Sequence, residues 1–341
     1  MNRDRPIISS IIALLAALGT ATTAQAIVIR HDISDARYLK LGNAFPSVGR
    51  LLIDNSSACS GTLIYQRWVL TAAHCLDDNF RSATFAVGGT SYFSNRAFLH
   101  PGWVRSNGDF GLGVDIALLR LNRPVTRVRP ALFFPLRVPV VKRAGIYVGF
   151  GNTGTGYLPP QTTTYDYERK RGAVNTIDAY GSFYGDSNRL ILSDFDNGYY
   201  WNNELGSPVQ YVLEGSPAKG DSGGGVFIDG RLASIISFIQ AGSNASFDRP
   251  DSDYGDIMGS VRVAPFFSWI GATIRQNITT SSSLSLSKDN QSNTNSATEA
   301  VLAPEKPKSI AEPSTKFGLL VILSLMGLAR FFHPKRDRCN N

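Results

Sequence analysis

The sequence predicts an all-β fold, and two observations support this prediction. Short runs rich in β-branched and aromatic residues fill the middle of the 341-residue chain, separated by Gly, Pro and Asn. Long amphipathic helical patterns are absent until residues 264–276. When the two ends are set aside, residues 27–275 remain, which is enough for one large domain or two small ones.

The expected strands follow one another as short apolar runs. They are GTLIYQRWVLTA (61–72), VDIALLRL (114–121), GIYVGF (145–150), GGVFI (224–228) and LASIISFI (232–239). The exception is APFFSWIGATIRQ at 264–276, where Pro265 suits a helix start. Phe266, Ile270 and Ile274 then recur every four residues, so we expect a short carboxy-terminal helix.

Residues 1–26 have the pattern of a secretory signal peptide. Arg3 and Arg5 form a basic start, Ile7–Leu18 is mostly apolar, and Ala24-Gln25-Ala26 is a small-residue cleavage site. The alternative is a buried amino-terminal helix, which does not account for this order. We therefore expect export and a cut by signal peptidase after Ala26.

The carboxy-terminal end predicts a linker and an anchor. Residues 276–310 are rich in Ser, Thr and Asn and bury too little apolar surface to offset the cost of ordering, so we expect a disordered linker. Residues 311–341 contain the apolar segment Phe317–Ala329, short for a bilayer span, followed by a basic end. Lys316 and Arg330 could lengthen the span by snorkelling.

The same tail resembles a PEP-CTERM sorting signal of bacterial exported proteins. Glu312-Pro313-Ser314-Thr315, the apolar segment and the basic cluster stand in the expected order, but Ala311 replaces the usual Pro. The resemblance implies a carboxy-terminal sorting enzyme as a partner, and a plain membrane anchor is the alternative. Much of the net charge of +7 lies at the two ends, so no nucleic-acid partner is expected.

The cysteines indicate an oxidising compartment. Only Cys59 and Cys75 lie in the expected exported part, and Cys339 follows the anchor. A lone pair in an exported chain predicts a disulfide. Closing a loop of this length would stabilise the fold by about 3 kcal/mol in the chain-entropy account.

Three polar side chains in the β framework suggest one chemistry. Ser222 lies in AKGDSGGG, His74 in TAAHC, and Asp115 inside the apolar run VDIALLRL. A serine hydroxyl is a poor nucleophile until a base takes its proton. A histidine can be that base, and a buried aspartate can hold its ring in the required tautomer. Gly220 and Ser222 could then aim backbone N–H groups at an oxyanion, provided the loop adopts conformations that glycine permits.

CSGTLIYQRWVLTAAHC, DIALLRL and GDSGGG closely resemble the catalytic blocks of trypsin/chymotrypsin-like serine peptidases. VGFGNTG and SWIGATI resemble two weaker blocks, so the likeness spans about residues 40–275. It implies two six-stranded antiparallel β-barrels, with a boundary near residue 135 and the site between them. It also implies protein or peptide substrates, cleaved through an acyl-enzyme.

The resemblance also assigns roles to residues. His74 would be the general base, Asp115 its orienting partner and Ser222 the nucleophile, with Gly220 as an oxyanion donor. The run Ser237-Phe238-Ile239 would lie beside the substrate backbone. Gly225 stands where the family has Pro, Phe238-Ile239 where it has Trp-Gly, and the family's further disulfides are absent.

Two finer expectations come from positions relative to the nucleophile. Ser216 would form the floor of the primary pocket, where trypsin-like members have Asp. We therefore expect no strong preference for basic side chains; apolar or aromatic ones should be favoured, although Lys219 could favour acidic ones. Asp221 would pair with a buried amino terminus, and the signal-peptide cut would expose Ile27 for that pair.

The sequence also allows other functions to be considered: a dinucleotide site, a metal site, a binding module and an esterase. Gly149–Gly154 fits a dinucleotide fingerprint, but the prolines in the following TGYLPPQTTTY argue against the helix that this requires. Asp77 and Asp78 are interpreted as solvated rather than metal-binding, and no cofactor is expected. A catalytically silent binding module on the same scaffold is the alternative, although the triad is complete. An esterase is chemically allowed, but the chain lacks G-x-S-x-G around the serine.

Overall fold

The structure is a computed structural model that describes residues 27–77, 80–159, 168–181, 188–207, 210–243 and 250–289. The expected signal peptide, the expected linker beyond residue 289, the apolar tail segment, Asp78 and Cys339 lie outside these residues. Among the residues described, no helix has the length and apolar character needed to cross a membrane.

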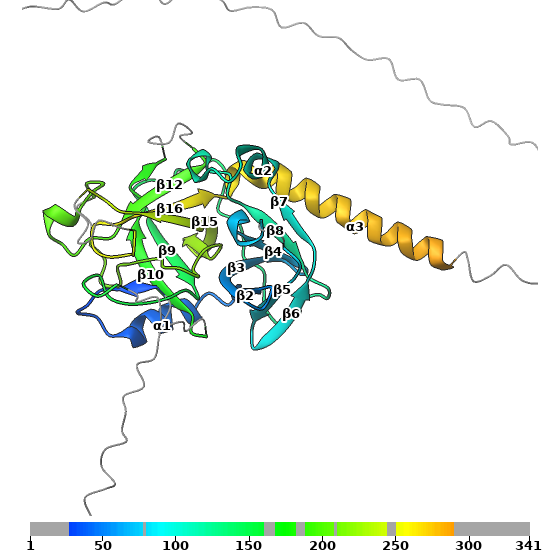
Figure 1. Cartoon of the computed structure of the whole chain (residues 1–341), viewed down its shortest axis with the longest axis horizontal. Helices are drawn as coiled ribbons and strands as arrows, with labels where there is room; N and C mark the ends of the chain where they lie inside the picture. The colour runs from blue at the N-terminus through cyan, green and yellow to red at the C-terminus, as the bar shows by residue number, and fades with distance from the viewer. Residues whose placement is uncertain are drawn as a thin grey trace, which may run out of the picture. The chain divides into compact units, whose positions relative to one another are not determined.

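The described chain forms two large antiparallel sheets (Figure 1). The first sheet has the order β6-β5-β2-β3-β4-β8-β7. Its strands are β2 (Val48–Ile53), β3 (Ser57–Tyr65), β4 (Trp68–Thr71), β5 (Ala83–Val87), β6 (Thr90–Ser94), β7 (Ala97–Leu99) and β8 (Ala117–Arg120).

The second sheet follows the connection through residues 121–143 and has the order β10-β9-β14-β15-β16-β12-β11. Its strands are β9 (Ala144–Gly149), β10 (Arg171–Thr176), β11 (Ala179–Tyr180), β12 (Leu190–Asp194), β14 (Gly225–Ile228), β15 (Arg231–Gln240) and β16 (Ile257–Arg262). The expected boundary near residue 135 falls within the connection. A separate pair joins β1 (Val28–Ile29) to β13 (Gly215–Ser216).

Each sheet has seven strands where six were expected, because one strand of each is broken by a bend. The two edge strands of the first sheet, β6 and β7, are separated only by Asn95 and Arg96. Those of the second, β10 and β11, are separated only by Ile177 and Asp178. Each sheet therefore curls until successive pieces of one strand reach its opposite edges. The all-β prediction with two curled antiparallel sheets is confirmed.

Hydrogen bonds across the closing edge support this description of the first barrel. The backbone N–H of Asn122 donates to the carbonyl of Phe93 (2.9 Å), and that of Arg120 donates to Arg96 (3.0 Å). Trp68, Leu63 and Phe85 are fully or almost fully buried within this barrel. The core is apolar because strand residues alternate toward the barrel interior.

Helices are few among the described residues. They are α1 (Asp35–Asn43), α2 (Pro101–Ser106), α3 (Phe267–Asp289) and the short 3₁₀ turns η1 (Ala73–Cys75), η2 (Phe110–Leu112), η4 (Tyr200–Asn202) and η5 (Ala264–Phe266). The sequence did not predict α1, which packs on β10 at Gly42, where a Cβ would come within 2.5 Å of Arg171. Asp35 of α1 also pairs with the fully buried Arg171.

The expected carboxy-terminal helix is present but longer than predicted. Pro265 lies in η5, and α3 continues through residues 276–289, which were expected to begin the disordered linker. The helix therefore extends past the expected start of the linker, because adding residues to an existing helix needs no new nucleus and polar residues are tolerated in it.

Candidate active site

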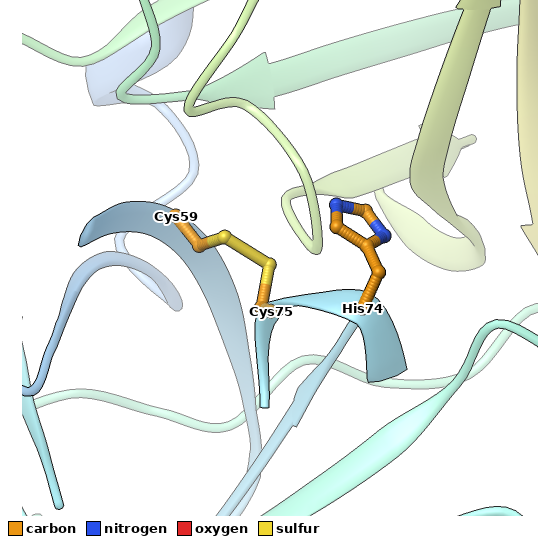
Figure 2. Close-up of side chains that lie close together, drawn as sticks. All are labelled: Cys59, His74 and Cys75. Carbon is orange, nitrogen blue, oxygen red and sulfur yellow. A yellow bond between two sulfur atoms is a disulfide. The ribbon is translucent and has the colours of Figure 1, made fainter. Parts of the chain in front are cut away.

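His74 lies in the 3₁₀ turn η1, which follows β4. A disulfide joins Cys75 of this turn to Cys59 of β3, with the two Cα atoms 6.4 Å apart, which confirms the predicted bridge. Figure 2 shows this bridge with the His74 ring beside it. The two sulfurs lie within 4.8 Å of a His74 ring nitrogen, but they are bonded to each other and offer no thiolate to a metal ion.

Asp115 holds His74 by two hydrogen bonds. Its Oδ1 accepts from the backbone N–H of His74 (2.8 Å), and its Oδ2 lies 2.7 Å from Nδ1 of the ring. Asp115 is fully buried, and Ser237 donates a further hydrogen bond to Oδ2 (2.6 Å). Burial of the ring lowers the pKa of His74, but the charge and hydrogen bond of Asp115 outweigh it and the net pKa is raised.

Phe110 packs against the ring of His74. Phe110 belongs to η2, and the centroid of its ring lies 5.4 Å from that of His74 and 6.0 Å from that of Phe238. No local pattern in the sequence indicates this contact, because Phe110 lies in a loop whose position depends on the rest of the barrel.

The loop that carries Ser222 is pinned to β3. The backbone N–H of Ser60 donates to the carbonyl of Ser222 (2.8 Å), and its hydroxyl donates to that of Gly220 (2.9 Å). Gly223 has a left-handed φ of 79°, and a Cβ there would lie 2.0 Å from Oγ1 of Thr71. The loop therefore needs glycine at this position for both conformation and space.

The backbone N–H groups expected to bind an oxyanion are available. Gly220 has a left-handed φ of 99°. Within the described residues, neither its N–H nor that of Ser222 donates a hydrogen bond. Backbone donors without acceptors are rare in folded proteins, so this arrangement suits an incoming carbonyl oxygen.

Ser222 borders two hollows of about 330 Å³ each. The first is also lined by His74, Gly220 and Cys75, so the expected nucleophile and base border the same cavity. The second is lined by Ser237, Phe238 and Ile239, the run expected to lie beside the substrate backbone. The structure thus gathers the sequence-predicted residues at the meeting point of the two sheets.

Ser216 is the exception among the expected substrate-binding residues. It is fully buried in β13, paired with Val28, and it does not line the second hollow. The walls there include residues that the sequence did not indicate, namely Asn152, Pro217, Ala218, Pro250, Asp251 and Ser252. Their approach depends on loop packing, for which the sequence carries no local signal.

Asp221 and Ile27 lie together in the interior. Both are fully buried, and the backbone nitrogen of Ile27 is 3.3 Å from Oδ2 of Asp221. The same oxygen accepts from Ala218 (2.9 Å), and Oδ1 accepts from Gly151 (2.7 Å). Burial raises the pKa of Asp221 to about 7, against the effect of these hydrogen bonds.

Known proteins are similar to this chain in sequence and in fold. Residues 40–189 match the family described as Trypsin. Granzyme M of Homo sapiens is 29% identical over 66% of this chain and 82% of its own length. Chymotrypsin-like elastase family member 1 of Felis catus is 30% identical over 64% of this chain and 79% of its own. The chain belongs to the trypsin family of serine peptidases.

A solved structure agrees on the fold of this peptidase. Neuropsin, a serine protease expressed in the limbic system of mouse brain, superposes with a TM-score of 0.51, covering 68% of this chain and 96% of its own, at 20% identity. The trypsin-family chain is therefore a serine endopeptidase with two curled antiparallel sheets, as the sequence predicted.

The departures of this peptidase from its family pattern have local causes. A Cβ at Gly225 would lie 2.5 Å from the Phe227 ring and 2.9 Å from Oγ1 of Thr62, which leaves no room for Pro. A Cβ at Gly259 would lie 2.2 Å from the Phe238 ring, so this ring packs in the space that the glycine leaves.

Proposed function

We propose that Ser222 is the nucleophile of this peptidase, with His74 as its general base and Asp115 as the partner that orients the histidine. The observation that carries the proposal is the fully buried Asp115 carboxylate, which holds Nδ1 of His74 at 2.7 Å while His74 and Ser222 line one cavity. This hydrogen bond leaves Nε2 as the atom that accepts the proton of Ser222.

The reaction then proceeds in two halves. Ser222 Oγ attacks the substrate carbonyl as its proton passes to His74, and the N–H groups of Gly220 and Ser222 bind the oxyanion. His74 returns the proton to the leaving amine as the acyl-enzyme forms. Water, activated by the same histidine, releases the acyl group.

A fluorophosphonate probe tests the nucleophile. Folded protein should be labelled at Ser222, and Ser222→Ala should lose both labelling and peptide hydrolysis. His74→Ala should lower turnover by several orders of magnitude, because the nucleophile then lacks its base. Equal labelling of Ser222→Ala would refute the assignment, and a silent wild-type chain would support the binding-module alternative.

We also propose that the primary pocket prefers apolar or aromatic side chains. Half of its twelve lining residues are apolar, although Lys219 and Asp251 also reach it. The apolar residues are Pro217, Ala218, Ile236, Phe238, Ile239 and Pro250. A peptide library should show cleavage after Phe or Leu exceeding cleavage after Arg. Efficient cleavage after Arg that disappears in Asp251→Asn would show instead that Asp251 sets the preference.

Activation by the signal-peptide cut is a further part of the proposal. Ile27 has a left-handed φ of 59°, which is strained for a β-branched residue. A cut after Ala26 removes that torsion and turns the nitrogen beside Asp221 into an ammonium, which is the counter-charge for the buried carboxylate. Export alone would then switch the enzyme on.

Amino-terminal sequencing of active protein tests this proposal, with Ile27 as the expected first residue. Protein released at Ile27 from a removable fusion should be active, whereas the same chain with one extra residue should be nearly inactive. Asp221→Asn should lose activity while keeping its circular-dichroism spectrum. Full activity in the extended chain would rule the idea out.

Finally, we propose that the peptidase is exported and tethered through residues 311–341. The disulfide supports an oxidising compartment, and the residue pattern of the tail supports a sorting or anchoring role. Cell fractionation should find the chain with the envelope, and truncation after residue 310 should release it. An unchanged distribution after truncation would contradict tethering.

A further inference from the structure

Three arginines meet where the first barrel closes, and none of them lines the hollows at Ser222. Arg67 lies in the turn between β3 and β4, Arg96 in the bend between β6 and β7, and Arg120 at the end of β8. The N–H of Arg120 donates to the carbonyl of Arg96 (3.0 Å), and the N–H of Leu121 donates to that of Arg67 (2.8 Å). The barrel backbone therefore fixes the three positions relative to one another.

These arginines border one small hollow of about 210 Å³. Its other lining residues are Asn95, Leu121 and Asn122. Pockets for drug-sized molecules usually measure about 300–1,000 Å³, so this one suits a single small group rather than an extended ligand. The two asparagines can add amide donors to those of the guanidinium groups.

The hollow is strongly positive. Partial burial, and then the charges of Arg96 and Arg67, lower the pKa of Arg120, so the Arg120 guanidinium lies close enough to the other two to be repelled by each. Within the described part of the chain, the side chains of Arg67 and Arg96 form no ion pair or hydrogen bond. Among the described residues, no Asp or Glu lines this hollow. Asp77 lines a neighbouring hollow that Arg96 also borders, and its carboxylate accepts a hydrogen bond from the Trp103 indole (3.0 Å).

We propose that this hollow binds a phosphate or sulfate ester group carried by a larger molecule. A tetrahedral oxyanion offers several oxygens in different directions, which matches guanidinium groups that converge from three separate segments. Arginine forms paired hydrogen bonds with such groups, and a bound anion would relieve the mutual repulsion of the cluster. The rest of the molecule would extend into solvent from this site.

Isothermal titration calorimetry on the full chain carrying Ser222→Ala tests the site without any need for peptidase activity. The probes are sodium sulfate, sodium phosphate and glucose 6-phosphate, with sodium chloride holding the ionic strength constant. We expect saturable binding that weakens about tenfold in Arg96→Gln or Arg67→Gln and is lost in the double variant. Arg231→Gln, an exposed arginine on β15, is the matched control and should bind as the parent does.

Each outcome decides the proposal. Equal heats in the parent and the double variant, at matched melting temperature, would overturn it. Tighter binding of glucose 6-phosphate than of free phosphate would support an esterified group, whereas the reverse would restrict the site to free ions and overturn the ester assignment. Because binding is read in a chain without the nucleophile, failure of the proposed catalytic roles would leave this result unaffected.

Discussion

At the scale of single residues, the site depends on how one buried carboxylate is satisfied. Asp115 accepts from the His74 backbone, faces the His74 ring and receives the Ser237 hydroxyl. A buried charge is stable only when its hydrogen bonds are complete. Ser237 was expected beside the substrate backbone, and the structure adds a contact with the Asp115–His74 pair. We therefore infer that it is a positioning residue.

Ser237→Ala should shift the pH profile as well as reduce activity. Losing a donor makes the Asp115 carboxylate more basic and strengthens its hold on the imidazolium, so the pKa of His74, already raised, should rise further. The acid limb of kcat/KM should move to higher pH, with a loss in kcat of about tenfold. Ser234→Ala, on the same strand, removes a buried hydroxyl without a partner among the described residues and should leave the profile unchanged.

At the scale of elements, the nucleophile loop and the histidine turn are both fixed to β3. Ser60 holds the loop through two carbonyls, and the disulfide from Cys59 holds the turn. Sγ of Cys75 lies 3.8 Å from the Ser222 carbonyl oxygen, so the two segments meet directly. One strand therefore positions both halves of the proposed catalytic pair.

Gly223→Ala should damage this loop far more than the same change at another left-handed glycine. A Cβ at Gly223 would lie 2.0 Å from Oγ1 of Thr71 and 2.5 Å from the Ser60 carbonyl oxygen, whereas none of the described atoms lies within 4 Å of one at Gly230. Gly230→Ala should cost about 1 kcal/mol for its φ alone. Urea unfolding and peptide hydrolysis should show a larger loss of stability, and loss of activity, only for Gly223→Ala. Equal effects of the two variants would contradict the packing argument.

Removing the disulfide tests the other attachment to β3. The double variant Cys59→Ala/Cys75→Ala should lose about 3 kcal/mol of unfolding free energy, because the unfolded chain is no longer constrained. Calorimetry or urea titration would measure it. A loss below about 0.5 kcal/mol would indicate that native strain offsets the constraint.

At the scale of the whole molecule, the second barrel buries several acids in their neutral form. Burial and the charge of Asp196 raise the pKa of Glu214 to about 8. Burial, together with Asp194, raises the pKa of Asp178 to about 8. The unfolded chain loses these protons near pH 4, so between about pH 4 and 8 the folded state binds more protons. Stability contributed by the neutral forms is therefore lost as the pH rises.

The melting temperature should accordingly fall between about pH 5.5 and pH 8.5. His74 acts in the same direction, because stability from its raised pKa is present below its ordinary value and lost as the pH rises through the folded value. Glu214→Gln keeps a neutral side chain and should flatten the decline. Glu168→Gln, with a side chain 77% exposed, should not. A melting temperature that rises with pH in the parent would contradict the account.

The sequence by itself determined the fold class, the family, the disulfide and the residues proposed for catalysis. Each of these depends on local signals: alternation and turn residues for strands, cysteine count for the bridge, and short blocks around His74, Asp115 and Ser222. Such signals survive in one dimension because they are fixed by neighbours in the chain.

Only the tertiary structure decided what surrounds those residues. It buried Ser216 away from the substrate hollow, brought Asp251 into that hollow, and placed Phe110 against His74. It also placed Ile27 beside Asp221, a contact that the sequence suggested only through family likeness. These positions depend on how curled sheets close and how loops pack across them, so residues far apart in the chain become neighbours without any local pattern to announce it.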